Sequence, residues 1–330
     1  PLKLEIGLPL VSSYGCRMTE PAVMYSIVIP VYNSEKILPV LIERIRRVFG
    51  DITDQYEIIF VDDCSPDGSW TVLKELKKKD DKVKIVHLIR NFGQHNAILC
   101  GFQFCKGRYI LVMDDDLQHP PEEIPKLIRK IDEGYSAVYG KYQIKYHSRI
   151  ENFFSRRFQR LIHHSLDIPE DIFISSFAIF RGDVIKNVAS IRTSYIFLPA
   201  LISKSTPVNK IANVEVNHHP RTVGSSNYSP FRYLKLALNL IINYSALPLV
   251  IVSTFGLFLS IVSIGVGIYI LIKKLTDPSY GIMGWNSLMV ALAFLGGILL
   301  FTLGIIGEYL RRILAEVSYE QPFAVGEMQI

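Results

Sequence analysis

The chain has 330 residues, enough for about two domains, since globular domains usually run to roughly 100–200 residues. A hydrophobic content of 49% excludes a disordered chain, and 21 glycines and 17 prolines without a repeat exclude a collagen-like one. The net charge of +5 is compatible with an anionic substrate or an anionic membrane surface, but it is too small to indicate nucleic-acid binding.

Short apolar strands and amphipathic helices alternate along the first half of the chain. Strands are predicted at 26–31, 56–61, 83–88, 107–113 and 136–139. Helices with one apolar face are predicted at 35–49, 69–79, 94–105 and 121–134. This alternation is typical of βαβ units, so we expect a parallel sheet covered by helices on both faces. Ligands bind at the carboxyl ends of such strands, and the residues directly after each strand are therefore the candidate site.

The second half is basic and then strongly apolar. Residues 149–162 place apolar side chains on one helical face and four arginines on the other. Such a helix lies in a membrane interface or packs as an ordinary surface helix, and the pattern leaves both open. The uncharged runs 247–272 and 288–306 have 26 and 19 residues. About 20 apolar residues cross a bilayer, so the two runs predict a transmembrane hairpin.

The charges that flank the hairpin predict its orientation. Arg232 and Lys235 precede it and Arg311 and Arg312 follow it, against two lysines in the link. Because positive charge favours the cytoplasmic side, the α/β domain is expected in the cytosol, on the inner (cytoplasmic) membrane of the cell. The absence of a signal-peptide pattern near the start agrees. We expect an N-terminal extension at 1–24, the α/β domain at 25–228, a juxtamembrane helix at 229–246, the hairpin at 247–310 and a C-terminal cytosolic tail at 311–330.

Three consecutive carboxylates give the strongest chemical signal. Asp114, Asp115 and Asp116 come directly after an apolar strand, at the expected ligand edge. Packed carboxylates repel one another unless a cation lies among them. Oxygen ligands suit Mg²⁺ or Mn²⁺, which also bind phosphate oxygens. The alternative is a solvated acidic turn, which the position at a strand end disfavours.

Two other strands also end in candidate binding residues. Asp62 and Asp63 follow one strand, and Asp67 in the same stretch suits a turn or a helix cap. Tyr32 follows the first strand, where an aromatic ring can lie on a nucleobase. The alternative for this last stretch is a capped helix start.

Four stretches resemble glycosyltransferase family 2: SIVIPVYN, FVDDCSPDGS, LIRNFGQHNAILCGF and DDDLQHPP. Other segments narrow the resemblance to one group within this family: the basic helix, the stretch 219–228, the apolar hairpin and the sequence GEYL at 307–310. They are similar to the polyprenyl-phosphate glycosyltransferases, which include bactoprenol glucosyltransferases, undecaprenyl-phosphate aminoarabinose transferases and dolichyl-phosphate mannose synthases. The resemblance covers about residues 25–320. It implies an α/β fold of the GT-A type, a Rossmann-like nucleotide-sugar-binding domain, with juxtamembrane amphipathic helices and a two-helix transmembrane hairpin.

The resemblance also implies roles for individual residues. For nucleotide-sugar binding it implies Pro30, Tyr32, Glu35, Asp62, Asp63, Asp114 and Asp115. For the metal it implies Asp114, Asp116 and Gln118, with Mg²⁺ or Mn²⁺ as cofactor. It implies that Asp114, Asp116 and Arg221 are catalytic, and that Arg221 and Ser226 meet the acceptor phosphate. The planar guanidinium of an arginine also suits phosphate oxygens, independently of the resemblance. The alternative for Arg221 is a positively charged anchor beside the membrane.

Three positions depart from the family pattern. Ser34 stands where a glutamate often follows the asparagine, and Asn227 stands where a lysine usually follows the acceptor-loop serine. Ser176 occupies the place of an aspartate proposed as a base in some relatives. A phosphate monoester has a second pKa of about 6 and is already ionised near pH 7, so the reaction does not depend on that base.

The expected activity is inverting transfer of one sugar, with UDP-glucose or another UDP-hexose as donor and polyprenyl (undecaprenyl) phosphate as acceptor, for modification of cell-surface glycans. The expected partners are the donor, the lipid and the membrane, without nucleic acid, and the sequence is compatible with a homo-oligomer. One alternative is a processive polysaccharide synthase, although no Gln-x-x-Arg-Trp motif surrounds Trp70 or Trp285. The other is a non-catalytic membrane scaffold that binds a lipid phosphate, which the three departures would support.

Overall fold

The computed structural model describes residues 23–142, 169, 172–193, 196–217, 247–276, 285–318 and 321–330. The predicted N-terminal extension, apart from its last two residues, lies outside these ranges, as do the basic helix 149–162 and the juxtamembrane helix 229–246. Arg221 and Ser226, the predicted acceptor-phosphate residues, also lie outside the described residues.

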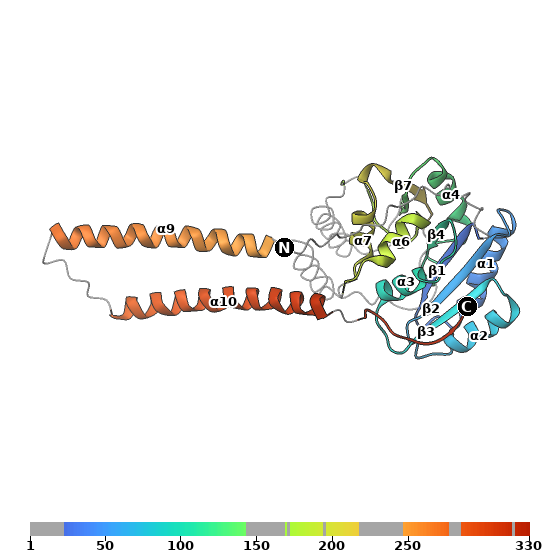
Figure 1. The fold of residues 1–330 in the computed structure, drawn as a ribbon, viewed down its shortest axis with the longest axis horizontal. Coiled ribbons are helices and arrows are strands. Elements are labelled where there is room, and N and C mark those ends of the chain that lie inside the picture. Colours follow the sequence, from blue (N-terminus) through green and yellow to red (C-terminus); the bar gives the residue numbers. More distant parts are fainter. Residues whose placement is uncertain are drawn as a thin grey trace, which may run out of the picture.

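An eight-stranded mixed sheet forms the centre of the globular part (Figure 1). Its strands are β1 (Tyr25–Val31), β2 (Tyr56–Asp62), β3 (Val83–Leu88), β4 (Tyr109–Val112), β5 (Ala137–Tyr142), β6 (Ala178–Arg181), β7 (Ile211–Val216) and β8 (Val325–Gln329), in the order β7-β5-β6-β4-β1-β2-β3-β8. The predicted strands are confirmed. The prediction of a wholly parallel sheet is wrong, because β6 runs antiparallel to β4 and β5 and β8 runs antiparallel to β3. Both strands follow their preceding sheet strands only after long stretches of sequence, so the local pattern did not predict their directions.

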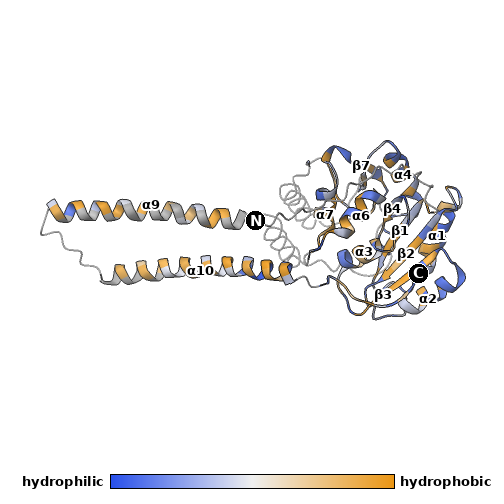
Figure 2. Ribbon diagram, in the orientation of Figure 1, coloured by the Kyte–Doolittle hydropathy of each residue, from blue (hydrophilic) through white to orange (hydrophobic). Residues whose placement is uncertain are grey.

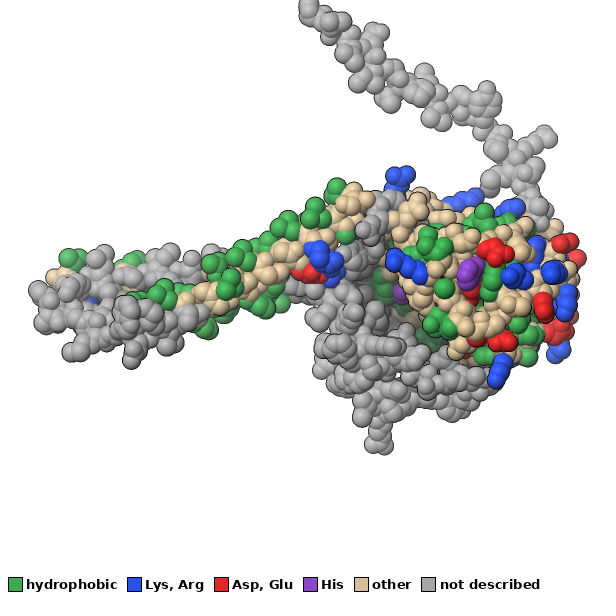
Figure 3. All heavy atoms as spheres, turned by 90° about the horizontal axis from the view of Figure 1, so that it is seen from below, with side chains coloured by type: hydrophobic (Ala, Val, Ile, Leu, Met, Phe, Trp, Pro, Cys, Tyr) green, Lys and Arg blue, Asp and Glu red, His purple; other side chains and the backbone are tan. Residues whose placement is uncertain are grey.

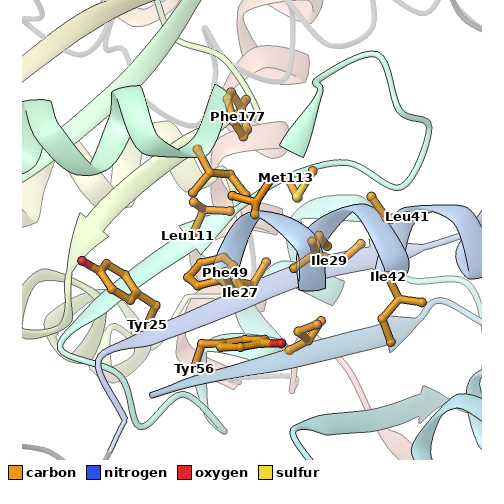
Figure 4. Packing of buried hydrophobic residues seen from close by; sticks show 14 of the residues in the cluster. Tyr25, Ile27, Ile29, Leu41, Ile42, Phe49, Tyr56, Leu111, Met113 and Phe177 are labelled. Carbon is orange, nitrogen blue, oxygen red and sulfur yellow. The ribbon is translucent and has the colours of Figure 1, made fainter. Parts of the chain in front are cut away.

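Helices cover both faces of the sheet, as the sequence predicts. They are α1 (Leu38–Gly50), α2 (Ser69–Lys79), α3 (Gln94–Phe102), α4 (Ile124–Asp132), α6 (Gly182–Ser190) and α7 (Leu198–Ser205), with short 3₁₀ turns η1 (Pro121–Glu123) and η2 (Val208–Lys210). One buried apolar cluster joins α1, α2 and α4 to the sheet, and Figure 4 shows part of it around Ile27, Phe49 and Leu111. The other joins α3, α6 and α7 to the opposite face. On that face α3 approaches β1 so closely that a Cβ on Gly101 would lie 2.5 Å from a methyl group of Val28.

A buried ion pair joins the amino ends of the central strands. Lys84 Nζ of β3 lies 2.5 Å from Glu57 Oε2 of β2, and both side chains are at least 90% buried. The other oxygen, Glu57 Oε1, accepts hydrogen bonds from Ser26 Oγ of β1 at 2.5 Å and from Lys106 N at 2.7 Å. One carboxylate thus holds three strands and the turn before β4 in register.

Two long helices project from the globular part and run beside each other in opposite directions (Figure 1). They are α9 (Leu247–Thr276) and α10 (Trp285–Ser318), and they contain the two predicted apolar runs. Figure 2 colours much of both helices hydrophobic, and Figure 3 shows apolar side chains along the nearer of the two. Within the described part, one stretch meets the length and composition of a membrane span: Phe294–Ser318 of α10, with a mean hydropathy of 1.5 and its most apolar part unburied.

The residues after α10 return to the globular part. Residues 311–330 are predicted as a C-terminal tail; in the structure α10 continues to Ser318, and β8 pairs with β3 at the edge of the sheet. The period-two pattern of β8 is weak, because glycine, glutamate and glutamine make up three of its five residues. Long-range pairing, not local pattern, therefore makes this strand.

Acid is expected to destabilise the globular part through His95. This ring packs edge-on against Phe197, 5.3 Å between ring centroids, and its Nδ1 has no hydrogen-bond partner within the described residues. Burial lowers the pKa of His95 from 6.5 to about 4. Between these two pH values the unfolded chain binds a proton that the folded chain does not. The free energy of unfolding should therefore fall by about 1.4 kcal/mol per pH unit as the pH drops through this window. Melts from pH 7 to pH 4.5 should show a smaller loss in His95→Phe, and equal losses in both proteins would contradict the assignment.

Candidate active site

The loops after β1, β2 and β4 meet at one edge of the sheet. The register pairs Tyr25 with both Tyr56 and Tyr109, so the three parallel strands begin at one level. Direct hydrogen bonds then join their loops: Tyr32 N donates to Asp115 Oδ2 at 3.1 Å, and Asn33 N donates to Ser65 Oγ at 3.0 Å. The predicted neighbourhood of these three strand ends is therefore present.

Backbone strain is concentrated in the same three loops. The non-glycine residues with positive φ in the described chain are Asn33 (60°), Cys64 (55°) and Leu117 (59°). Each follows a different one of these strands. Such conformations cost of order 1–3 kcal/mol each and cluster at functional sites. The strain marks this edge independently of the residue types.

Asp114 is held from two sides by neutral donors. Gln94 Nε2, at the start of α3, donates to Asp114 Oδ1 at 2.6 Å. Ser176 Oγ, just before β6, donates to Asp114 Oδ2 at 2.5 Å. Ser176 is the position at which some relatives are thought to carry a base, so in this chain the residue orients a carboxylate instead of supplying one.

Asp115 points in a different direction from its two neighbours in the sequence. Its Oδ2 accepts from Tyr32 N and, at 2.5 Å, from Ser34 Oγ. Burial raises the pKa of Asp115 to about 7, against the lowering effect of these two hydrogen bonds. The side chain predicted to bind the nucleotide sugar is therefore engaged with the loop after β1, and the family departure at Ser34 supplies one of its partners.

Asp116 and Gln118 belong to one tight turn. Gln118 N donates to Asp116 Oδ1 at 3.1 Å across the left-handed Leu117. The turn is backed by His119, whose Nε2 lies 2.7 Å from the Tyr142 hydroxyl and whose ring stacks on Phe177 with centroids 5.3 Å apart. This packing fixes the turn against the sheet.

The acidic loop has the donor chemistry of a divalent-cation site. Asp114, Asp116 and the side-chain amide of Gln118 offer the oxygen ligands that Mg²⁺ and Mn²⁺ take. Asp114 and Asp116 are half-buried, and the oxygens of Asp114 are oriented by Gln94 and Ser176. Within the described ranges no group of three or more histidine, cysteine, aspartate or glutamate side chains is placed to hold a metal ion.

The two carboxylates at the carboxyl end of β2 are buried, and each accepts a hydrogen bond from the backbone of a loop. Asp62 accepts from Ser65 N at 3.3 Å and lies 2.6 Å from His87 Nδ1. Asp63 accepts from Phe92 N at 2.7 Å and Gly93 N at 2.8 Å. Burial raises the pKa of Asp63, with these two N–H groups acting against it. Asp62 is fully buried and Asp63 is 3% exposed, so both stabilise the loops of the site from beneath the surface.

Of the three residues predicted to bind the nucleotide sugar around the first strand, Tyr32 is exposed, whereas Pro30 and Glu35 contribute to the structure of the strand and of the loop that follows it. Tyr32 is 49% exposed. Pro30 is buried within β1. Glu35 Oε2 accepts from Gly68 N at 3.1 Å, and Glu35 N donates to Asp67 Oδ2, so Asp67 is a turn residue as predicted.

Sequence reasoning did not assign a role to Gln94, His87 or Arg90. His87 lies in β3 near its carboxyl end, Arg90 lies in the loop that follows, and Gln94 begins α3 after that loop, where ligands are expected to bind. The exposed Arg90 guanidinium lies 4.7 Å from the Phe92 ring centroid. The strand-end rule could have selected these residues, but the carboxylates that Gln94 and His87 contact depend on the packing of the loops.

Removing the Ser176 hydroxyl should weaken activity without abolishing it. Ser176→Ala removes the hydrogen bond to Asp114 Oδ2 and keeps the one from Gln94, and a hydrogen bond to a charged group contributes about 1.5–3 kcal/mol. We expect kcat to fall by about tenfold to a hundredfold in a steady-state transfer assay. Ser176→Thr keeps the hydroxyl and is the matched control; equal losses in both variants would show that packing, not the hydrogen bond, matters here.

Known proteins match both the sequence and the fold. The family model for Glycosyl transferase family 2 matches residues 26–189. The "Uncharacterized glycosyltransferase YkcC" of Bacillus subtilis (strain 168) is 34% identical over 309 residues, 90% of this chain and 91% of that protein. The "Undecaprenyl-phosphate 4-deoxy-4-formamido-L-arabinose transferase" of Klebsiella pneumoniae (strain 342) is 32% identical over 299 residues, 90% of this chain and 91% of that protein.

Among solved structures, glucosyl-3-phosphoglycerate synthase from Mycobacterium tuberculosis shares the fold. Its complex with phosphoglyceric acid gives a TM-score of 0.51 with 15% identity, over 66% of this chain and 79% of that chain. Its complex with Mn²⁺ and UDP-glucose gives 0.50 with 17% identity, over 67% and 77%. The α/β domain thus has the GT-A architecture. With two relatives above 30% identity along nearly its whole length, the chain belongs to glycosyltransferase family 2.

Proposed function

We propose that this protein is a membrane-bound, inverting glycosyltransferase that moves one sugar from a nucleotide sugar to polyprenyl phosphate. The observation that carries the proposal is the joined, strained set of loops after β1, β2 and β4, in which the acidic stretch Asp114–Asp116 is bonded through Asp115 to the backbone of the exposed Tyr32. The Klebsiella relative named above carries undecaprenyl phosphate in its name and matches both the α/β domain and the apolar helices. We take UDP-hexoses, with UDP-glucose first, as the donors to test.

The two long helices support a membrane location. Large apolar side chains are exposed on both, among them Phe258 of α9 and Phe301 of α10. A helix that is apolar all round needs a lipid or protein environment. We propose that α9 and α10 form a transmembrane hairpin, with the α/β domain on the cytoplasmic face of the inner membrane. A water-soluble donor and a lipid acceptor would then meet at that face.

The side chains divide the reaction into three tasks. Tyr32 would stack on the base, while Asp62 and Asp63 hold the walls around the nucleoside. Asp114, Asp116 and Gln118 would hold Mg²⁺ or Mn²⁺, which supplies positive charge against the departing diphosphate. Arg221 and Ser226 would bind the acceptor phosphate, so that its oxygen attacks the anomeric carbon directly. A single displacement inverts the anomeric configuration, and no protein base is needed for an ionised phosphate.

The test is a panel of nucleotide sugars with undecaprenyl phosphate and Mg²⁺ or Mn²⁺, read by the mass of the lipid product. The expected product is the lipid phosphate with one hexose, formed in the presence of detergent-solubilised protein. Chains of several sugars would instead establish a processive synthase. Binding of the lipid phosphate without turnover of any donor would establish a non-catalytic scaffold.

A further inference from the structure

A row of polar side chains crosses the sheet beside the candidate donor site. Asp62 of β2 stands opposite His87 of β3, and His87 stands opposite Glu327 of β8. Opposed residues of neighbouring strands place their side chains on the same face. Three residues far apart in the sequence, the last from the C-terminal strand, therefore line up at one level of the sheet.

Contacts hold this row together. His87 Nδ1 lies 2.6 Å from Asp62 Oδ2, at hydrogen-bonding distance. The Trp70 ring packs on the His87 ring with centroids 5.0 Å apart. Trp70 Nε1 in turn donates to Glu327 Oε2 at 3.1 Å. Glu327 therefore fixes the indole, the indole fixes the imidazole, and the imidazole fixes Asp62.

The row continues into the loop that carries the exposed tyrosine. The second oxygen of Asp62 accepts from Ser65 N at 3.3 Å. Ser65 Oγ accepts from Asn33 N at 3.0 Å, and Asn33 is the strained residue that follows Tyr32. A displacement of Asp62 would move this connection, and with it the surface offered to a nucleoside.

We propose that the C-terminal strand β8 is a positioning element of the donor site, acting through Glu327, Trp70 and His87 on Asp62 and the loops beside it. The inference rests on the proposed function in that it takes this edge to bind a nucleotide. Because β8 follows α10 in the chain after a short connection, the same strand links the donor site covalently to the long helices. His87, Trp70 and Glu327 are positioning residues here and touch no reacting atom.

Paired substitutions test each link in the full-length protein. His87→Ala removes the hydrogen bond to Asp62, whereas His87→Asn retains an N–H donor at the same reach. Glu327→Ala removes the acceptor for Trp70 Nε1, whereas Glu327→Gln retains one. Thr193→Val is the control, because Thr193 Oγ1 donates to Glu316 Oε2 of α10 at 3.2 Å and so joins the same helix to the globular part at another place. Melting temperatures confirm that each variant is folded.

The measurements are the Kd for UDP and for GDP with Mg²⁺, and the KM for donor and for lipid. Trp70 fluorescence reports binding once Trp285 is replaced by phenylalanine, since these are the two tryptophans of the chain. We expect His87→Ala and Glu327→Ala to raise the Kd of the nucleotide that the wild-type protein binds, and the donor KM, by about tenfold, which corresponds to 1.4 kcal/mol. The KM for lipid should stay constant, and His87→Asn and Glu327→Gln should bind nearly as the wild type does.

The outcomes separate this inference from the proposed function. Unchanged nucleotide Kd values in folded His87→Ala and Glu327→Ala would overturn the positioning role, even if the wild type transfers sugar. A wild type that binds UDP or GDP with the expected dependence on His87 and Glu327, but makes no lipid-linked sugar, would overturn the proposed function and leave the inference standing. A wild type that binds neither nucleotide would overturn both.

Discussion

Replacing Asp116 by alanine should abolish sugar transfer while the protein still folds. Asp116 is half-buried in a turn at the edge of the sheet, where it accepts a hydrogen bond from the backbone N–H of Gln118. Loss of a carboxylate that holds a divalent cation removes several kcal/mol of stabilisation from the departing diphosphate, so we expect transfer to fall by about 1000-fold or more. The measurement is product formation by mass, alongside the melting temperature.

Two comparisons make this result specific. Asp54→Asn changes a carboxylate that is 97% exposed and remote in the sequence from the acidic loop, and it should transfer sugar at the wild-type rate. A chelator should reproduce the Asp116→Ala loss in the wild type, and added Mg²⁺ or Mn²⁺ should reverse it. Full activity in Asp116→Ala together with resistance to the chelator would count against the cation site and against the roles proposed for Asp114 and Gln118.

Removal of the Glu57 carboxylate should cause the largest loss of stability. Glu57→Ala leaves the Lys84 ammonium buried without its partner, and the hydroxyl of Ser26 and the N–H of Lys106 lose their common acceptor. Breaking a buried pair from one side costs about 3–5 kcal/mol. For a domain of this size the melting temperature should fall by roughly 6–20 °C. Calorimetry or thermal denaturation followed by circular dichroism measures the shift.

A double substitution separates two contributions to the free energy of unfolding: the cost of burying the Lys84 ammonium without a partner, and the stabilisation by the Glu57–Lys84 ion pair itself. Glu57→Gln with Lys84→Met removes both charges while the amide oxygen can still accept from Ser26 and from Lys106. We expect it to recover more than half of the stability that Glu57→Ala loses, since an uncompensated buried ammonium is the main cost. A double variant as unstable as Glu57→Ala would show that the ion pair itself, rather than the isolated lysine, determines stability at this end of the sheet.

Local sequence was sufficient to predict the elements of the first half and the edge that carries the candidate site. Strand and helix periods are set by neighbouring residues, and the strand-end rule then selects Asp62, Tyr32 and Asp114. The pairing of Asp115 with Ser34 could not be predicted, because it depends on how two loops 81 positions apart settle against each other. The same holds for β6 and β8, whose places in the sheet are set by long-range pairing and not by their short, weak patterns.

The position of β8 also imposes an order on the biosynthesis of this protein. The ribosome makes β3 well before α9 and α10, and makes β8 only after them. Until then the edge of β3 has unpaired N–H and C=O groups, a surface on which other chains aggregate. The sheet can therefore be completed only after the two apolar helices have been synthesised. A nascent chain that stalls within them leaves the aggregation-prone edge of β3 exposed to the quality-control machinery of the cell.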